Sequence, residues 1–537
     1  MVSFAHPIIG QIAGREVDAC TQFLGVKYAA LRNRFAHAEL VRYDGSGIDA
    51  TRFGPQVVSP EQGVDMEFGL IQQFLPKPDF PGISDVNGLN LNITIPGRAN
   101  TIVTQRNLLP VLVFIHGGGF GIGGNWWPQY DFARLVKLSS DLGKPMIGVN
   151  INYRLGVPGF LTSPELRAAG YKANNSLRDQ RVALRWIQDN IFGFGGDPDN
   201  VTVLGESAGA VSTGYLLLSD EKLAKRLVCL GGCPPLLGSV LPLEVADHAA
   251  QSAVAALGLK YASPSELVDR LLDVPVQDLF AKMSPAIPLL PTVDGDVISK
   301  QFSYHSFAEE TTQMPGRQWI ESILMVYSEL DASIMGSMNL SHRSEGIAAK
   351  FRESAAKSLD DFPEALASLL DHYSLSLAAT DRIEDNAALL RILALINDVT
   401  FFLPAINMAT KYPKDSFVMA FNEPNPWDGP FKGHATHILD VAFLFQNFNG
   451  RLSQIQRDTA VAFGTDIIGY VSGENPGKAF GRGDKGAIGI YANGKRQDAA
   501  DGQELNARRA FLHDLAHGEK GPGLDKVVRV VSEFLVG

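Results

Sequence analysis

Short apolar runs that alternate with helical patterns predict an α/β protein with a large, mostly parallel central sheet flanked by helices. Leu109–Ile115 and Pro145–Ile151 are continuous apolar runs, which are typical of strands buried on both faces. Tyr130–Leu142 lies between them and has a helical pattern, and Asn175–Asn190 is strongly amphipathic. A turn, F-G-G-D-P-D-N, then leads to the strand V-T-V-L that starts at Val201. The order strand, helix, strand predicts crossover helices that cover both faces of the sheet.

The chain becomes mostly helical from approximately residue 240 to residue 408. Apolar residues at helical spacing predict helices over Ala246–Leu257, Ser263–Leu272 and Asp385–Leu403. One predicted strand, Ile323–Val326, interrupts them. We interpret these helices as insertions around a continuing sheet, so we expect residues 1–537 to form a single domain.

The C-terminal part adds one more predicted strand, Ser416–Phe421. The stretch Gly473–Gly502 contains many glycines and one short apolar run, and it is predicted to be a loop. A final helix is predicted to begin near Gly523.

The composition excludes several classes of partner. The chain has 537 residues and a net charge of −11, without a basic cluster that would attract nucleic acid or an anionic membrane. No run of about 18 apolar residues occurs, so we expect no membrane span and no stable membrane association. The start M-V-S-F-A-H-P-I-I-G-Q lacks the apolar core of a signal peptide.

Three cysteines, Cys20, Cys229 and Cys233, are too few for a disulfide framework. They predict free thiols and, with no signal peptide pattern, a cytoplasmic location. Cys229 and Cys233 lack companion ligands at metal-binding spacing, so no metal site is expected.

A candidate nucleophile follows the strand that starts at Val201. Gly205–Gly209 reads G-E-S-A-G, and an apolar helical pattern comes after it. This is the G-x-S-x-G motif in its strand-to-helix context, where small flanking residues allow a sharp turn that exposes the serine oxygen. Ser207 is therefore predicted to be a nucleophile; the alternative is an ordinary polar residue at a turn.

A glycine loop directly follows the strand Leu109–Ile115. His116–Phe120 reads H-G-G-G-F, and consecutive glycines let backbone N–H groups approach an oxyanion closely. The H-G-G-G pattern is paired with G-x-S-x-G in esterases and lipases, and no G-K-[S/T] follows that would indicate a nucleotide-binding loop.

These motifs and several longer stretches resemble the type-B carboxylesterase/lipase family, which includes cholinesterases and many fungal esterases. The stretches N-Y-R-L-G-V-P-G-F at Asn152–Phe160 and Asp179–Thr202 are similar to the family's sequence before the nucleophile. F-L-G-V-K-Y-A at Phe23–Ala29 resembles its N-terminal signature, and the resemblance covers roughly Ile8–Phe448. It implies an α/β-hydrolase fold and a serine-dependent carboxylic ester hydrolase that forms an acyl-enzyme and needs no cofactor.

In this family the nucleophile is followed along the chain by an acid and then by a histidine base. G-H-A-T-H-I-L-D-V-A-F-L-F at Gly433–Phe445 resembles the segment that carries the base. It implies His437, with His434 as the alternative. Y-S-E-L-D-A-S resembles the acid segment and implies Asp331, with Glu329 as the alternative because many relatives use glutamate.

The resemblance also implies an oxyanion hole formed by the N–H groups of Gly118, Gly119 and Ala208. Glu206, beside the nucleophile, matches an acidic residue of cholinesterases and either assists electrostatically or is a buried structural carboxylate. Four aromatic residues are candidates for the wall of a substrate pocket, although large aromatic side chains are more often core residues: Phe120, Trp126, Trp127 and Phe443.

The leading functional hypothesis is a hydrolase of small to medium hydrophobic esters. An interface-acting lipase is one alternative, because the modestly apolar segment Asp65–Pro81 lies near the position of the lid in lipases of this family. A non-catalytic, cholinesterase-like binding protein is the other. Secreted relatives commonly carry a disulfide where Val57 and Gly88 stand here, so its absence fits a reducing compartment. The natural ester and the oligomeric state are left open.

Overall fold

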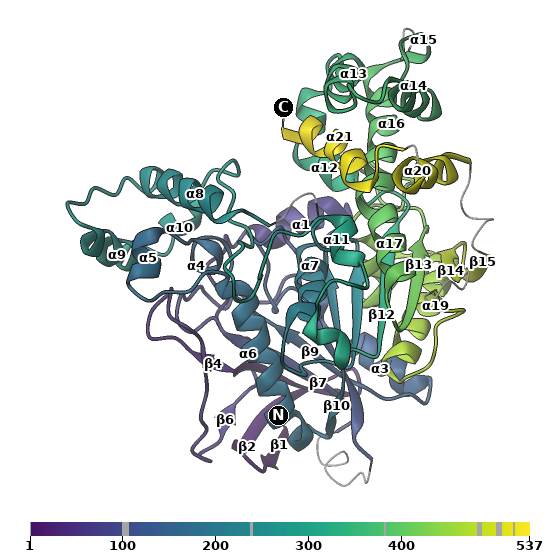
Figure 1. The fold of residues 1–537 in the computed structure, drawn as a ribbon. Coiled ribbons are helices and arrows are strands. Elements are labelled where there is room, and N and C mark those ends of the chain that lie inside the picture. The colour runs from purple at the N-terminus through teal and green to yellow at the C-terminus, as the bar shows by residue number, and fades with distance from the viewer. Residues whose placement is uncertain are drawn as a thin grey trace.

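The computed structural model describes residues 2–98, 107–236, 240–380, 383–480, 486–500, 507–518 and 521–536. Within them, a 13-stranded sheet runs through the molecule in the order β1-β2-β3-β7-β9-β8-β10-β11-β12-β13-β14-β15, and β6 pairs with β2 (Figure 1). The fold is the predicted α/β arrangement with a large, mostly parallel sheet.

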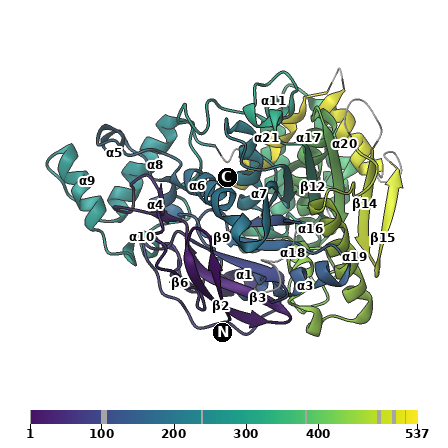
Figure 2. The ribbon, with the colours of Figure 1, turned by 90° about the horizontal axis from the view of Figure 1, so that it is seen from below.

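The middle of the sheet is parallel, and the outer strands are antiparallel. The parallel strands are β9 (Ile147–Ile151), β8 (Leu109–Ile115), β10 (Gly196–Glu206), β11 (Arg226–Leu230), β12 (Ser322–Ser328), β13 (Asp415–Phe421) and β14 (Ala487–Ala492). Antiparallel strands at the edges are β1 (Val2–His6), β2 (Gly10–Val17), β3 (Cys20–Lys27) and β7 (Asn90–Pro96) on one side and β15 (Lys495–Ala500) on the other (Figure 2). The short strand β6 is Ile48–Asp49, and β4 (Ala29–Ala30) and β5 (Glu39–Leu40) form a separate pair.

Helices cover both faces of the parallel strands. One face carries α6 (Asn175–Asn190), α7 (Ala208–Tyr215) and α17 (Leu403–Lys411), and the other carries α3 (Ala133–Asp141), α18 (Leu439–Leu444) and α19 (Gln454–Val471). Because side chains alternate along a strand, β8 contributes side chains to two separate cores. Val111 and Val113 pack into the first core, and Leu112 and Phe114 into the second.

The remaining helices lie mainly in two groups beyond one end of the sheet (Figure 1). One group contains α4 (Gly156–Phe160), α5 (Pro164–Ala168), α8 (Leu243–Ala256), α9 (Pro264–Asp273) and α10 (Asp278–Ala281). The other contains α12 (Ser333–Met338), α13 (Ile347–Ser358), α14 (Pro363–His372), α15 (Leu377–Thr380), α16 (Asp385–Asn397), α20 (Ala507–His517) and α21 (Leu524–Val536). Two other helices of the described residues are α1 (Gly63–Ile71) and α11 (Tyr304–Ala308). Short helical turns are η1 (Pro128–Tyr130), η2 (Ile191–Phe194), η3 (Leu216–Leu218), η5 (Pro315–Gln318), η6 (Leu340–Arg343), η7 (Asp398–Phe402) and η8 (Asn449–Arg451).

Several predicted elements match the structure closely. The strand Leu109–Ile115 and the helix Asn175–Asn190 have the predicted bounds, and the helix predicted from Gly523 begins at Leu524. The helix predicted over Asp385–Leu403 extends further than expected, because a single π-helical turn, η7, joins α16 to α17. From residue 240 to residue 411, the described residues form helices α8 to α17, short turns and one strand of the sheet, β12.

The prediction of a loop over Gly473–Gly502 is wrong for part of its length. Strands β14 and β15 lie within this range and form an antiparallel hairpin. Its turn is Asn493-Gly494, with φ of +53° and +78°. An Asn-Gly pair favours this type of turn because both residues tolerate positive φ, so the sequence carried a hairpin signal. Residues 481–485 and 501–502 of the predicted loop lie outside the described residues.

One helical stretch in the described part of the chain, Asp385–Lys411, is long and apolar enough to cross a membrane by length and composition. However, 78% of the most apolar 18-residue segment of this stretch is buried inside the protein. The stretch packs on β12 and β13 and on the neighbouring helices, so its apolar residues belong to the core. The three cysteines are buried and unpaired, as predicted.

Candidate active site

Ser207 occupies a sharp turn between β10 and α7. Its φ of +53° and ψ of −119° are unfavourable for a residue with a side chain, and such strain persists only where the surrounding structure enforces it. A Cβ on Gly205 would lie 2.1 Å from the carbonyl oxygen of Gly209, and one on Gly209 would lie 2.1 Å from that of Ile115. Only glycine therefore fits on either side. The Ser207 N–H donates to the Leu230 carbonyl at 2.9 Å, which fixes the turn against β11.

The glycine loop after β8 lies beside this turn. Gly118 and Gly119 have φ of +90° and +59°, which favour glycine. Their N–H groups, and that of Ala208 in the first turn of α7, donate to no acceptor among the described residues. A Cβ on Gly117 would lie 3.0 Å from the Ser207 Cβ, so the loop and the serine turn are in close contact.

His116 anchors the start of this loop. Its ring stacks on Tyr153 with the centroids 4.5 Å apart, and its Nδ1 lies 3.0 Å from the Gly117 carbonyl oxygen. Burial lowers the pKa of His116 to about 4, so the imidazole is neutral at ordinary pH.

The site lies where the strand order reverses. The chain leaves β8 toward β9 on one side and returns to β10 on the other side of β8. In open α/β sheets, ligands bind outside the carboxyl ends of the strands at such a switch point, because the connecting loops diverge there. The glycine loop and Ser207 follow these two diverging strands.

His437 and Asp331 form a buried pair. The Nδ1 atom of His437 lies 2.9 Å from the Oδ1 atom of Asp331, and their side chains are 5% and 0% exposed. The second carboxylate oxygen of Asp331 accepts from the N–H of Ser328 at 2.6 Å, and the His437 N–H donates to Ser333 Oγ at 3.0 Å. The carboxylate thus holds the Nδ1–H tautomer and leaves Nε2 able to accept a proton.

The Nε2 atom of His437 lies 3.2 Å from Oε1 of Glu206, the residue immediately before Ser207. Burial lowers the pKa of His437, but the hydrogen bond with Asp331 and the nearby carboxylates outweigh burial and raise the pKa to about 9. Burial raises the pKa of Glu206 well above its usual range. Ser207, Glu206, His437 and Asp331 are therefore gathered in one place from three separate parts of the chain.

Two further buried carboxyl groups influence this centre. Burial, together with the charge of Asp331, raises the pKa of Asp440 to about 7. Burial also raises the pKa of Glu67, to about 7, although Glu67 Oε1 accepts from Gln129 Nε2 at 2.8 Å and from the Tyr130 hydroxyl at 2.5 Å. Sequence reasoning missed Glu67; the only signal was an acidic residue in the apolar segment Asp65–Pro81.

The alternative base and the alternative acid pair with each other instead. His434 Nδ1 lies 3.5 Å from Glu329 Oε2, and these side chains are 37% and 44% exposed. The hydrogen bond with Glu329 raises the pKa of His434.

The four aromatic pocket candidates are all buried. Phe120 packs against Phe160 with ring centroids 4.8 Å apart. Phe443 is fully buried and packs against Phe421 and Trp427 in the second core.

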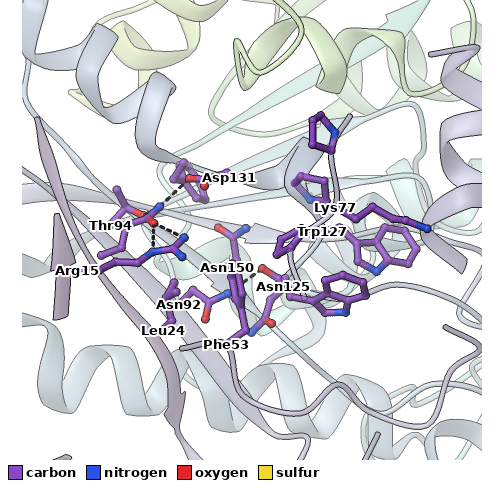
Figure 3. Close-up of a pocket in the computed structure, with 16 residues that line it drawn as sticks. Arg15, Leu24, Phe53, Lys77, Asn92, Thr94, Asn125, Trp127, Asp131 and Asn150 are labelled. Atoms are coloured by element: carbon purple, nitrogen blue, oxygen red, sulfur yellow. Dashed lines mark hydrogen bonds between the residues drawn. The ribbon is translucent and has the colours of Figure 1, made fainter. Parts of the chain in front are cut away.

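Trp126 and Trp127 line a cavity of about 250 Å³ (Figure 3). Polar side chains from β7 and β9, Asn92 and Asn150, line it too. Neither Ser207 nor His437 is among its lining residues, so the two tryptophans line a space separate from the serine turn.

Solved structures of other proteins share this architecture. A PNB esterase superposes with a TM-score of 0.68 at 22% identity, covering 94% of this chain and 99% of that one. A carboxylesterase from Geobacillus stearothermophilus superposes with a TM-score of 0.71 at 21% identity, covering 95% and 99% of the two chains. The protein thus has the α/β-hydrolase fold.

The sequence also matches the family described as the carboxylesterase family over residues 2–472. Because this match spans most of the chain, the protein belongs to the carboxylesterase family. Lipase 5 of Diutina rugosa is 29% identical over 486 residues, which cover 83% of each protein. A secreted lipase of Arthroderma benhamiae, ARB07186/07185, is 38% identical over 210 residues, but the match spans only 34% of that protein.

Proposed function

We propose that the protein is a carboxylic ester hydrolase in which Ser207 is the nucleophile, His437 the general base and Asp331 the acid that orients the base. The observation that carries the proposal is the gathering of a strained serine turn, a glycine loop and a buried histidine–carboxylate pair at the switch point of the sheet. Membership in the carboxylesterase family supports the same reaction class.

In the proposed reaction, His437 Nε2 takes the proton of the Ser207 hydroxyl as its oxygen attacks the ester carbonyl. The imidazolium then donates that proton to the leaving alcohol, and an acyl-enzyme remains. Water, activated by the same histidine, hydrolyses the acyl-enzyme and releases the acid. Asp331 keeps the proton on Nδ1 and stabilises the imidazolium during both steps.

The developing oxyanion would be bound by the N–H groups of Gly118, Gly119 and Ala208. These donors have no acceptor among the described residues, so they are available without breaking an existing hydrogen bond. Donors fixed in advance contribute strongly to catalysis, because removal of one typically costs about 3 kcal/mol.

The contact between His437 Nε2 and Glu206 bears on how the base works. Glu206 would stabilise the protonated imidazole that forms during each proton transfer, since opposite charges attract strongly at a buried site. Catalytic hydrogen bonds often form fully only in the substrate complex, so we expect Nε2 to engage the Ser207 hydroxyl when an ester is bound.

We expect small to medium hydrophobic esters as substrates. A lipase that acts at lipid interfaces is a second candidate, favoured by one observation. Met66 on α1 and Phe74 just after it are 56% and 53% exposed, within the segment expected to resemble a lid. Exposed apolar side chains of this kind can enter a lipid surface. A jump in activity when tributyrin exceeds its solubility would favour the lipase, and a smooth saturation curve would favour the esterase.

A cytoplasmic location also fits the proposal, because all three cysteines are free and Val57 and Gly88 stand near the family's cysteine positions.

The proposal is tested with purified protein and p-nitrophenyl esters from acetyl to dodecanoyl, beside the Ser207→Ala variant. We expect kcat of the variant to fall by about 10⁴-fold or more, while its unfolding temperature stays close to that of the wild type. The chain length that gives the highest kcat/KM would report the size of the acyl pocket. Retained hydrolysis in a folded Ser207→Ala variant would contradict the proposal, and a folded but inactive wild type would favour a non-catalytic binding protein.

A further inference from the structure

The side chain of Asn397, the last residue of α16, makes three hydrogen bonds to the Ser328–Ala332 segment, which carries Asp331. Its Oδ1 accepts from the Ala332 N–H at 3.0 Å. Its Nδ2 donates to the carbonyl oxygens of Ser328 at 3.2 Å and Glu329 at 2.9 Å. The side chain is fully buried, so water does not compete for these bonds.

These bonds hold backbone groups on both sides of Asp331. Ser328 also donates its N–H to the Asp331 carboxylate, so Asn397 fixes a residue that itself orients the acid. The carboxamide is suited to this role because it offers two donors and one acceptor in one plane. An aspartate side chain has the same shape but lacks the two N–H donors. An alanine side chain lacks both the donors and the acceptor.

The turn that follows Asn397 is fixed as well. Asp398 lies 3.1 Å from the guanidinium of Arg509 on α20 and accepts from the Tyr373 hydroxyl at 3.0 Å. Phe401, in the same π-helical turn, packs against His437 with ring centroids 5.8 Å apart. A π-helical turn often marks a functional position within a helix. The junction of α16 and α17 therefore contacts His437 directly and the backbone on both sides of Asp331.

We propose that Asn397 is a positioning residue, which acts through the Ser328–Ala332 backbone to hold the Asp331 carboxylate against His437 Nδ1. This inference rests on the proposed function. Removal of the carboxamide leaves the loop free to move away from His437, which lengthens the hydrogen bond between Asp331 and His437.

The first consequence is kinetic. A small misplacement of a catalytic group typically lowers the rate by about 10²-fold, so we expect Asn397→Ala to lower kcat on p-nitrophenyl esters by roughly 10- to 100-fold. We expect little change in KM, because Asn397 lies behind the acid and touches no part of the glycine loop.

The second consequence is a shift in pH dependence. Asp331 raises the pKa of His437, so a weaker bond between them lowers that pKa. The acid limb of the kcat/KM profile, where the imidazole loses its proton, therefore moves to lower pH in Asn397→Ala. A general loss of stability would not move this limb.

Asn407→Ala is a matched control. Asn407 is also a buried asparagine on the same helical stretch, but its Nδ2 donates to the Tyr304 carbonyl at 3.3 Å, away from the acid loop. We expect this variant to keep the wild-type kcat and the wild-type acid limb. If Asn397→Ala does not fold, Asn397→Ser carries the test, with a smaller loss of kcat and the same direction of shift.

The experiment compares kcat, KM and the pH profile for the wild type, Ser207→Ala, the folded Asn397 variant and Asn407→Ala. An unchanged kcat and acid limb in the folded Asn397 variant, or an equal loss in Asn407→Ala, overturns the role of Asn397. Full activity in Ser207→Ala instead overturns the proposed function itself, so the two failures are distinguishable.

Discussion

Two histidine–carboxylate pairs lie side by side in this protein, and they differ mainly in burial. His437 and Asp331 are 5% and 0% exposed at a separation of 2.9 Å. His434 and Glu329 come from the same two loops but are 37% and 44% exposed at a separation of 3.5 Å. Of the two pairs, the buried one contacts Glu206, the residue beside Ser207.

The two loops are held in register by a bridge between Leu330 and Thr436, with the Leu330 N–H donating to the Ala435 carbonyl at 2.8 Å. One pair lies on each side of this bridge. Exposed ion pairs contribute little because water and salt screen them, whereas buried charges interact strongly and shift each other's pKa. Burial in the core, and not residue type, therefore distinguishes the candidate catalytic pair from the surface pair.

Substitution of the two histidines should give the largest difference in kcat between the pairs. We expect His437→Ala to lower kcat by about 10⁴-fold or more, since loss of a catalytic base costs nearly as much as loss of the nucleophile. His434→Ala should keep kcat within about threefold of the wild type, because a surface substitution rarely affects a buried site. Steady-state kinetics on p-nitrophenyl butyrate would check both, and a severe loss in His434→Ala would reverse the assignment of the base.

Substitution of the two carboxylates should give the next largest difference in kcat between the pairs. Asp331→Asn keeps the shape of the side chain but favours the wrong tautomer of His437, and such a change in a related triad lowers kcat by about 10⁴-fold. Glu329→Gln should change kcat by less than about threefold. Pre-steady-state release of p-nitrophenol measures acylation directly; an active Asp331→Asn beside an inactive Glu329→Gln would identify Glu329 as the acid.

The pH dependence of kcat/KM should show which neighbouring groups act on His437. Only the neutral imidazole accepts a proton, so kcat/KM should rise with pH through the raised pKa of His437, about 9. Because Glu206 is one of the groups that raise the pKa of His437, Glu206→Gln should move this limb to lower pH. His434→Ala should leave the limb in place. An unchanged limb in Glu206→Gln would show that Glu206 does not act on His437.

The smallest expected effect is on stability. His434 and Glu329 are both more than one-third exposed, so we expect Glu329→Gln to change the free energy of unfolding by at most about 1 kcal/mol. Because Glu329 raises the pKa of His434 in the folded protein, this contribution is present below the unfolded pKa and is lost as the pH rises through the folded pKa. Urea unfolding at low and at high pH would measure it, and a much larger change would mean that the exposed pair is structural.

Much of the fold and the local motifs could be predicted from the sequence. The strand β8, the helix α6 and the turn around Ser207 follow from short-range patterns, such as continuous apolar runs and glycines on both sides of a serine. The β14–β15 hairpin was not predicted, because its Asn-Gly turn lies within a longer glycine-rich stretch.

The rest of the site depends on contacts between distant parts of the chain. Glu329 and Asp331 are two residues apart, and nothing in their local sequence tells which one faces the core. Asn397 has no local signal, because its three hydrogen bonds reach a loop about 65 residues earlier in the chain. Phe443 followed the family pattern but packs in the core, since spacing does not distinguish a pocket wall from a packed interior.

The most direct test of the central claim is covalent labelling with a small fluorophosphonate, followed by mass spectrometry of the digested protein. We expect a single adduct on Ser207 in the wild type and in His434→Ala, formed at similar rates. Labelling should be slower by about 10³-fold or more in His437→Ala, because the hydroxyl then has no base. An adduct on another residue, or normal labelling in His437→Ala with loss in His434→Ala, would contradict the assignment of Ser207 and His437.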